Sequence, residues 1–302
     1  MAELSKISGV AIADVAAVDA VLKANIASIL GLTLPSGAAF LLDTYTGAAA
    51  GYSVRRIASG ATNLMRIRED SGDTETDIGY DANGDLDTAA IATHCGSANG
   101  YVVTWYDQAG SNNATQSTQG NQPQIYDGTT QAVINVNGKP GVFCADGSDF
   151  MSVTGAVDTT ARTIYQWSVH SIDGTGSYPS VKTGQLTDFY NINTEIPRTF
   201  SLRATTSSGG NAASAINTNQ AYLRHSYADT TNLRTYLDGS STPIIDLSDA
   251  NEDWASADFE IFNSVSGSTG RLILSELVFW QSDQSSNRTG IETDINDYFS
   301  IY

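Results

Sequence analysis

The chain of 302 residues has few charges, few basic residues and few cysteines, and each shortage disfavours a class of protein. Charged residues make up 16% of the sequence, below the roughly 25% of typical soluble domains. Against 33 acidic residues there are only 15 lysines and arginines, so the formal net charge is −18. Nucleic acids and anionic membrane surfaces both attract Lys and Arg. We therefore expect neither nucleic acid nor a membrane as a partner.

Long apolar runs and a disulfide framework are also missing. No stretch approaches the roughly 18 apolar residues of a membrane-spanning helix. The apolar run near the N-terminus is interrupted by Asp14, Asp19 and Lys23, which does not resemble the core of a secretory signal peptide. The two cysteines, Cys95 and Cys144, allow at most one disulfide, and we expect two free thiols. Stability must then come from a hydrophobic core.

Residues 1–36 differ from the rest because apolar residues recur there with an 11-residue period. This period corresponds to about 3.67 residues per helical turn, whereas Gly9 and Gly31 weaken an uninterrupted helix. Helical turns and stacked β segments both remain open. A short apolar repeat cannot bury its face alone, so we expect the segment to form a homotrimer or an anchor through Leu4, Ile7, Val15, Val18, Ile26 and Ile29. The alternative is a helix packed on its own domain.

Residues 38–302 carry the pattern of an all-β domain. Short alternating or β-branched runs are bounded by Gly, Asn, Asp and Ser clusters. The clearest runs are residues 101–106, 163–170, 221–227, 233–237 and 271–280. Asp238 and Gly239 predict a turn after the fourth run. This arrangement predicts a two-sheet antiparallel sandwich or jelly roll.

Two helices are expected within this domain. Residues 88–94 follow Asp87, a residue type that caps helix N-termini. Residues 285–299 carry apolar side chains at a helical spacing, namely Ile291, Ile295, Tyr298 and Phe299. The second segment therefore predicts a C-terminal helix.

Residues 105–113 read Trp-Tyr-Asp-Gln-Ala-Gly-Ser-Asn-Asn. This segment resembles the Tyr-Asp-Gln motif in the catalytic domain of fungal α-L-arabinofuranosidase B, of glycoside hydrolase family 54. Residues 45–56 resemble the start of that domain, and residues 267–302 are similar to the last strand and terminal helix of laminin-G or concanavalin-like sandwiches. The resemblance covers roughly residues 38–302 and implies a lectin-like, concanavalin-like fold.

A second resemblance extends over the whole chain. The segments at 77–90 and 121–128, and the N-terminal repeat with its Lys-Ile-Ser-Gly-Val sequence, resemble bacteriophage virion proteins. This implies an exposed fibre, spike or decoration appendage, located in the virion and made in the host cytoplasm without a signal peptide. Residues 1–36 would contact other virion proteins, and residues 38–302 would contact host-surface glycans without catalysis. The alternatives are an arabinofuranosidase-like glycoside hydrolase and a purely structural capsid or tail decoration.

Hydrolysis of the family 54 type requires two carboxylates that flank the glycosidic bond. In the family, the acid/base Asp lies 11 residues before a Glu on the penultimate strand. If that Glu corresponds to Glu276, the Asp position falls on Val265, or on Ser264 or Asn263 with a slip of one or two residues. None of the three is a carboxylate. Glu195 is a weak counterpart of the nucleophile, so the sequence argues against catalysis.

The same Trp-Tyr-Asp-Gln segment supplies candidates for glycan contact. An aromatic ring can stack on a sugar, and polar side chains can hydrogen-bond its hydroxyls. The candidate residues are Trp105, Tyr106, Asp107, Gln108 and Asn112. The alternative is structural, because alternation along a strand buries one of the two aromatic residues and the following residues would form a rigid turn.

The segment that begins at Asp81 offers a weak metal site. Oxygen ligands at Asp81, Asn83 and Asp85 suit Ca²⁺, but the distal Glu of a calcium loop is replaced by Ala92. The alternative is an Asn-Gly turn. The three histidines, His94, His170 and His225, show no metal-ligand spacing. We expect His170 and His225 to lie at strand ends in structural roles, and no other cofactor is expected.

Overall fold

The computed structural model describes residues 40–302 with short gaps, and two short strands before them. The gaps are residues 146–147, 157, 159–162, 174–176, 184–185, 192–198, 205–207, 214–218, 230, 249–257 and 263–270. Between residues 172 and 218 only the backbone of the strands is described. In the described part no helix is long and apolar enough to cross a membrane.

The chain divides into two compact units, Met1–Phe40 and Leu41–Tyr302. In the first unit, β1 (Lys6–Ile7) pairs antiparallel with β2 (Val10–Ala11). Ile7 of the apolar repeat lies in β1. The other repeat residues fall outside the described part, namely Leu4, Val15, Val18, Ile26 and Ile29. The trimerising or anchoring role of this segment stays a prediction.

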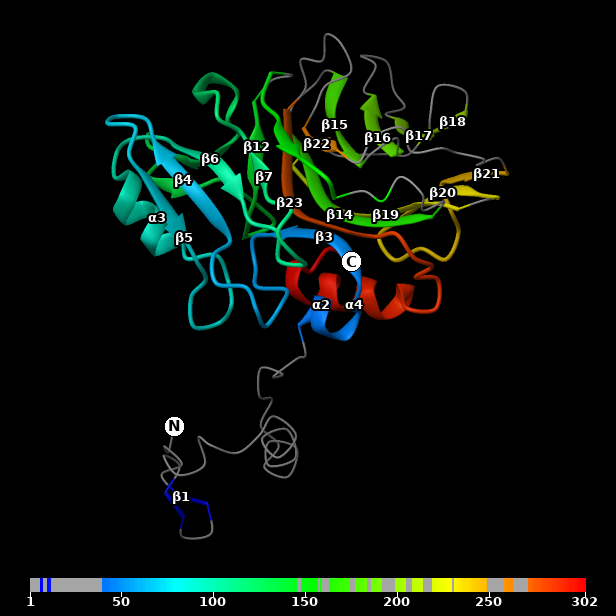
Figure 1. The fold of residues 1–302 in the computed structure, drawn as a ribbon, viewed down its shortest axis with the longest axis horizontal. Coiled ribbons are helices and arrows are strands. Elements are labelled where there is room, and N and C mark those ends of the chain that lie inside the picture. Colours follow the sequence, from blue (N-terminus) through cyan, green and yellow to red (C-terminus); the bar gives the residue numbers. More distant parts are fainter. Residues whose placement is uncertain are drawn as a thin grey trace. The chain divides into compact units, whose positions relative to one another are not determined.

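The second unit is built around one long strand, β23 (Arg271–Trp280), which runs through its centre in Figure 1. Strand β23 is almost wholly buried, as its apolar run predicts. It pairs antiparallel with β14 on one side and with β3 and β12 on the other. The ladder continues outward through β19, β20 and β21. The bounds are β3 Ala48–Ser53, β12 Val142–Cys144, β14 Ile164–Asp173, β19 Ala221–Ala228, β20 Leu233–Leu237 and β21 Ile245–Leu247.

A second layer of strands faces β14 and β19 (Figure 1). Its members pair antiparallel in chain order from β15 to β18, and β22 joins β15 to β13. The bounds are β13 Met151–Val153, β15 Ser177–Thr183, β16 Leu186–Asn191, β17 Thr199–Ala204, β18 Ser208–Ala213 and β22 Phe259–Ile261. The predicted antiparallel β-sandwich is therefore confirmed.

A smaller lobe follows β3 in sequence and lies at the left of Figure 1. Strand β6 is its centre and pairs with β4, β7 and β8. Strand β5 pairs with β4 and β9 with β8, while β10 and β11 form a separate hairpin. The bounds are β4 Met65–Glu69, β5 Glu75–Ile78, β6 Gly100–Trp105, β7 Ala114–Thr115, β8 Gln124–Asp127, β9 Ala132–Val133, β10 Asn135–Val136, β11 Lys139–Pro140 and η2 Gln119–Asn121.

Helix α3 (Thr88–Cys95) packs on this lobe and confirms the predicted helix and its cap. The side chain of Asp87 accepts a hydrogen bond from the backbone N–H of Ala90 at 2.9 Å. This bond satisfies a donor that the first helical turn leaves without a partner. Both cysteines, Cys95 and Cys144, are buried free thiols, as expected.

The C-terminal helix α4 (Arg288–Phe299) is shorter than predicted, because it begins at Arg288 rather than at residue 285. The preceding residues form a side-chain-closed turn, in which the carboxylate of Asp283 accepts from the backbone N–H of Ser285 at 2.8 Å. Such local bonds compete with helix formation. The helix buries Ile291, Ile295 and Phe299, as its spacing predicts, and the short helix α2 (Leu41–Thr44) lies near it (Figure 1).

A buried charge network joins α4 to the sheet. Glu276, on β23, is fully buried and accepts two hydrogen bonds from the guanidinium of Arg55, at 2.8 and 3.1 Å. The same guanidinium contacts Asp294 of α4 at 2.7 Å, and the Ser53 hydroxyl donates to Glu276 at 2.7 Å. A buried charge is tolerated when it is paired in this way. Glu276 therefore serves as a structural anchor.

Candidate functional site

The Trp-Tyr-Asp-Gln segment lies at the end of β6 and in the loop after it. The carboxylate of Asp107 accepts hydrogen bonds from three backbone N–H groups, those of Gly51 at 2.8 Å, Ala109 at 2.9 Å and Asn112 at 3.1 Å. Burial raises the pKa of Asp107, and these donors act in the opposite direction. The loop is thereby fastened to β3.

The neighbouring residues strengthen this attachment. Gln108 accepts from the backbone N–H of Ile57 at 2.7 Å and donates to the carbonyl of Arg55 at 2.8 Å. Trp105 is fully buried, and its indole N–H donates to the carbonyl of Ser53 at 3.2 Å. Trp105, Asp107 and Gln108 thus form a structural clamp between β6 and β3.

Tyr106 and Asn112, the other two predicted glycan contacts, are only partly buried. The Tyr106 hydroxyl donates to the carboxylate of Asp77 at 2.7 Å, and the carbonyl of Asn112 accepts from the hydroxyl of Tyr52. A glycan contact at this segment stays a prediction. The described geometry accounts for these residues as parts of the fold.

The segment from Asp81 to Asp85 forms a turn closed by its own first side chain. The Asp81 carboxylate accepts from the backbone N–H groups of Asn83 at 2.8 Å and Asp85 at 3.0 Å. Asp81 and Asp85 line a cavity of about 360 Å³ that Asn83 does not border. Lys139 lies beside it, with its ammonium 3.6 Å from the centroid of the Tyr298 ring. Within the described ranges, no group of three or more His, Cys, Asp or Glu side chains could hold a metal ion.

His170 and His225 lie inside strands, whereas the sequence predicts them at strand ends. His170 is in β14 and His225 is in β19, and both are buried. His225 stacks on Trp167 with ring centroids 4.1 Å apart, and its Nδ1 contacts the carbonyl of Gln166 at 3.1 Å. Burial lowers the pKa of His225 to about 3 and lowers the pKa of His170 well below its usual value. Both imidazoles are therefore neutral at ordinary pH.

The residues weighed for catalysis lie outside the described part of the chain, with one exception. Glu195 and the three acid/base positions, Asn263, Ser264 and Val265, are not described. The exception is Glu276, the residue from which the acid/base positions were counted. Its carboxylate is bound to Arg55. The expectation of no catalysis stays a prediction.

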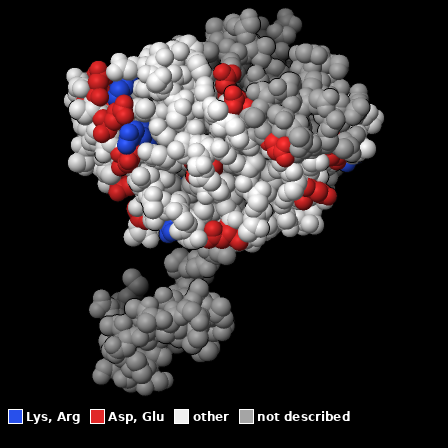
Figure 2. Space-filling view, viewed as in Figure 1, with Lys and Arg blue, Asp and Glu red and all other residues white. Residues whose placement is uncertain are grey.

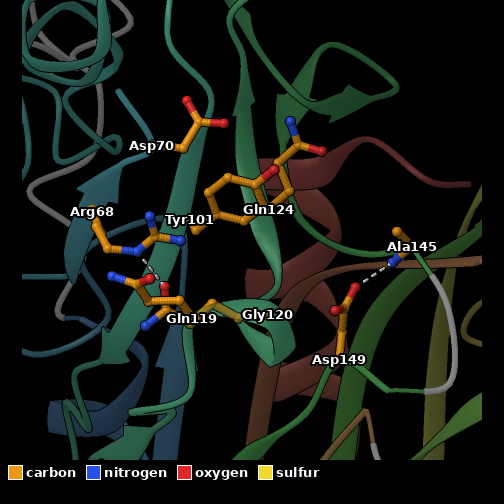
Figure 3. A pocket seen from close by; sticks show the side chains of 9 residues that line it. Arg68, Asp70, Tyr101, Gln119, Gly120, Gln124, Ala145 and Asp149 are labelled. Atoms are coloured by element: carbon orange, nitrogen blue, oxygen red, sulfur yellow. Dashed lines mark hydrogen bonds between the residues drawn. The ribbon is translucent and has the colours of Figure 1, made fainter. Parts of the chain in front are cut away.

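A different site emerges on the small lobe, where a cavity of about 380 Å³ opens between β4, β6 and β8 (Figure 3). Nine residues line it: Arg68, Asp70, Tyr101, Gln119, Gly120, Gln122, Gln124, Ala145 and Asp149. We call it the amide pocket because three of the nine are glutamines.

Strand register brings its central residues together. Arg68 on β4 is the partner of Tyr101 on β6, and Tyr101 is the partner of Gln124 on β8. Side chains opposite each other on neighbouring strands point to the same face. The three therefore form one row across the lobe, as Figure 3 shows for their side chains.

Arg68, at one end of this row, is held in a fixed orientation. Its side chain is only 6% exposed. The Nε–H donates to Gln122 Oε1 at 2.8 Å, and Nη1 contacts Asp73 at 2.6 Å. The guanidinium carbon lies 5.2 Å from the centroid of the Tyr101 ring. Among the described residues no acceptor is bound to Nη2, which leaves this nitrogen as a donor for a ligand.

The amides of the pocket have distinct roles. Gln122 is buried and uses both ends of its amide, because its Nε2 donates to the carbonyl of Gln116 at 2.9 Å while its oxygen binds Arg68. Gln124 donates through Nε2 to Asn99 Oδ1 at 3.2 Å and to the carbonyl of Tyr126 at 3.0 Å. Its Oε1 has two lone pairs for an incoming donor.

Two carboxylates stand at opposite sides of the pocket (Figure 3). Asp70 accepts from the backbone N–H and the side-chain amide of Asn99 at 2.9 and 3.0 Å. Asp149 accepts from the backbone N–H of Ala145 at 2.8 Å. The pKa of Tyr101 is raised, first by burial and then by the negative charge of Asp70, with a smaller contribution from Asp149. Both carboxylates therefore act on the ring at the centre of the pocket.

Sequence reasoning missed the amide pocket because its residues come from separate segments. Arg68, Tyr101 and Asp149 carry no shared motif and lie 33 or more positions apart along the chain. The one available signal was the segment at 121–128, which contains Gln122 and Gln124. The sequence shows only that this segment resembles virion proteins, and nothing in it marks the two glutamines as hydrogen-bonding groups of a site.

No family model and no curated protein sequence matches this chain. Solved structures do. A GH54 α-L-arabinofuranosidase soaked with a cyclic sulfate inhibitor is similar with a TM-score of 0.60 and 17% identity, over 81% of this chain and 62% of that one. An arabinofuranosidase complexed with arabinofuranosyl-α-1,2-xylobiose gives the same TM-score and coverage at 15% identity. This chain thus spans less than two thirds of those proteins. At such identities the likeness defines the fold, a concanavalin-like β-sandwich.

Proposed function

We propose that this protein is a bacteriophage virion protein, an exposed fibre, spike or decoration, whose sandwich domain binds host-surface glycan without catalysis. The observation that carries the binding part is the amide pocket. Its volume of about 380 Å³ falls within the range of small-ligand sites, roughly 300–1,000 Å³. It combines an aromatic ring with amide, guanidinium and carboxylate groups, which together match the ring face and hydroxyls of a sugar.

The ligand-facing groups are fixed before any ligand arrives. Arg68 is locked by Gln122 and Asp73, and Gln124 by Asn99 and Tyr126. A preorganised site loses less conformational entropy on binding. This favours a recognition site over an accidental hollow between side chains.

The virion role is supported by the organisation of the chain. The apolar repeat of residues 1–36 falls in a unit separate from the sandwich. Such a repeat needs partner chains to bury its apolar residues. We therefore assign it to trimerisation or to attachment on other virion proteins.

A glycan array probed with the full chain and with Tyr101→Ala tests the binding role. The expected result is saturable binding to at least one glycan by the full chain, weakened in the variant while its thermal unfolding is unchanged. If the full chain binds no glycan yet is found in purified particles, the protein is a purely structural decoration.

Hydrolysis is the second candidate function, because the fold matches family 54 enzymes over 81% of this chain. Release of arabinose from arabinan or arabinoxylan, abolished by Glu195→Gln, would establish it. The outcome we expect is no release of reducing sugar from either polymer.

A further inference from the structure

We infer that the amide pocket selects sugars that carry a protonated amino group, binds neutral sugars less well, and excludes sugars that carry carboxylate or sulfate. This inference rests on the proposed glycan-binding function. It is carried by the charges around the pocket and by how each of them is already bound.

The single cation of the pocket lining is already paired with a carboxylate outside the lining. Arg68 Nη1 lies 2.6 Å from the carboxylate of Asp73, a pair in which Arg68 is buried and Asp73 is 55% exposed. An arginine that already holds a carboxylate has less affinity for a second anion, because the pair has no net charge. Its remaining Nη2 suits a neutral acceptor, such as a sugar hydroxyl or ring oxygen.

A carboxylate of the lining, that of Asp70, is held by neutral groups. Asp70 is bound by the backbone and the amide of Asn99, which are neutral donors. Its charge acts on Tyr101 at the pocket centre and also on the thiol of Cys95, whose pKa is raised to about 11 chiefly by burial. Asp149 adds a second carboxylate to the lining.

A further negative charge lies next to Asp70 in the chain. Glu69 accepts hydrogen bonds from the hydroxyls and backbone N–H groups of Ser71 and Thr74. These bonds, led by that of the Ser71 hydroxyl, hold the pKa of Glu69 far below its usual range. Glu69 therefore adds a second carboxylate charge beside Asp70. Figure 2 shows acidic side chains on this part of the surface, with the few basic ones between them.

The negative charges of Asp70 and Asp149 favour sugars that carry a positive charge over sugars that carry a negative one. A hexosamine differs from the neutral sugar mainly by an ammonium group, which can donate to Asp70 and to Gln124 Oε1. A uronic or sulfated sugar would bring an anion beside Asp70 and Asp149, which like-charge repulsion disfavours.

The test is an array that contains amino, neutral and acidic glycans, probed with the full chain at about pH 6, where such amines are protonated. Hits are then measured in solution as matched pairs, each amino sugar against its N-acetylated form. We expect the free amine to bind about tenfold more tightly, and acidic members to be absent. Raising the ionic strength should reduce this preference.

Asp70→Asn probes the assigned residue, and Asp297→Asn, a change of the same kind at an exposed position of α4, is the control. The expected result is that Asp70→Asn lowers the ratio of amine to neutral affinity from about tenfold to near one, whereas the control leaves the ratio unchanged. Hits dominated by acidic sugars, or an amine preference that survives Asp70→Asn, would overturn the inference and leave the glycan-binding function standing. An array without any hit would overturn both.

Discussion

The side-chain amide of Gln122 accepts a 2.8 Å hydrogen bond from Nε of Arg68, in the interior of the small lobe. This bond fixes the plane of the guanidinium, since the same group also contacts Asp73. The edge of the guanidinium that carries Nη2 is thereby left to face the pocket. Arg68 lines the pocket, so the nitrogen that neither Gln122 nor Asp73 contacts can donate to a bound ligand.

Replacement of this guanidinium tests its role directly. Arg68→Lys keeps the positive charge but cannot contact Gln122 and Asp73 and also present a planar donor. We expect glycan affinity to fall by about tenfold, the scale of one lost charge-assisted hydrogen bond. Arg66→Lys, a surface change on the same strand where Arg66 pairs with Asp77, is the control and should leave affinity unchanged. Equal losses in both variants would contradict the assignment.

The ring of Tyr101 and its hydroxyl can be separated by two substitutions. Tyr101→Phe keeps the ring for stacking, so affinity should fall only a few-fold, by the loss of one neutral hydrogen bond. Tyr101→Ala removes the stacking surface as well and should cost about tenfold or more. Isothermal titration with the best array hit measures both. An alanine variant that binds like the wild type would remove Tyr101 from the site.

Asp107 should matter to folding and not to binding. In Asp107→Asn the amide nitrogen cannot accept the backbone N–H of Asn112 or that of Gly51 and Ala109. A buried donor left without a partner costs about 1–3 kcal/mol. We expect chemical denaturation to show a loss of this size, while glycan affinity stays the same. A loss of affinity without a loss of stability would instead support the glycan contact predicted from the sequence.

Asp238 provides a pH-dependent test of the turn after β20. Burial raises its pKa to about 6, although the backbone N–H of Leu223 donates to it at 2.9 Å. An unfolded Asp has a pKa of about 3.9, so between about pH 4 and pH 6 the folded state holds more protons. The stability that Asp238 contributes therefore falls as pH rises through this window and stays low above it.

Asp238→Asn removes this titration and keeps an acceptor for Leu223. Residue 238 has a φ of 49°, and asparagine tolerates this left-handed conformation well. Thermal unfolding should show a raised melting temperature at about pH 7 and little change at about pH 4, where the wild-type carboxyl is protonated. An equal shift at both pH values would mean that the conformational preference, and not the charge, is responsible.

The sequence predicts strands well where one side chain in two is apolar or where burial is complete. Strand β23 and the pair β19 and β20 lie where these patterns indicate, and the turn at Asp238 and Gly239 has the positive φ values that such a turn requires. The start of α4 is missed because Asp283 closes a local turn that periodicity does not reveal. Boundaries depend on such individual hydrogen bonds, whereas element type depends on a whole segment.

The amide pocket could not be predicted in the same way. Arg68, Tyr101 and Gln124 become neighbours only through the pairing of three strands, and that register includes two irregularities. A conspicuous motif, by contrast, can be structural, as the burial of Trp105 and Asp107 demonstrates. A local segment shows which functional groups are present, and the register of strands that are distant in sequence decides which of these groups lie together in a site.

The most direct test of the central claim is the affinity of the full chain for its best array hit, with Tyr101→Ala and Arg68→Lys compared under the same conditions. The account predicts saturable binding by the wild type and about tenfold weaker binding by each variant, measured at a temperature where each variant is folded. Binding of equal strength by all three proteins would place the glycan elsewhere on the molecule and contradict the assignment of the amide pocket.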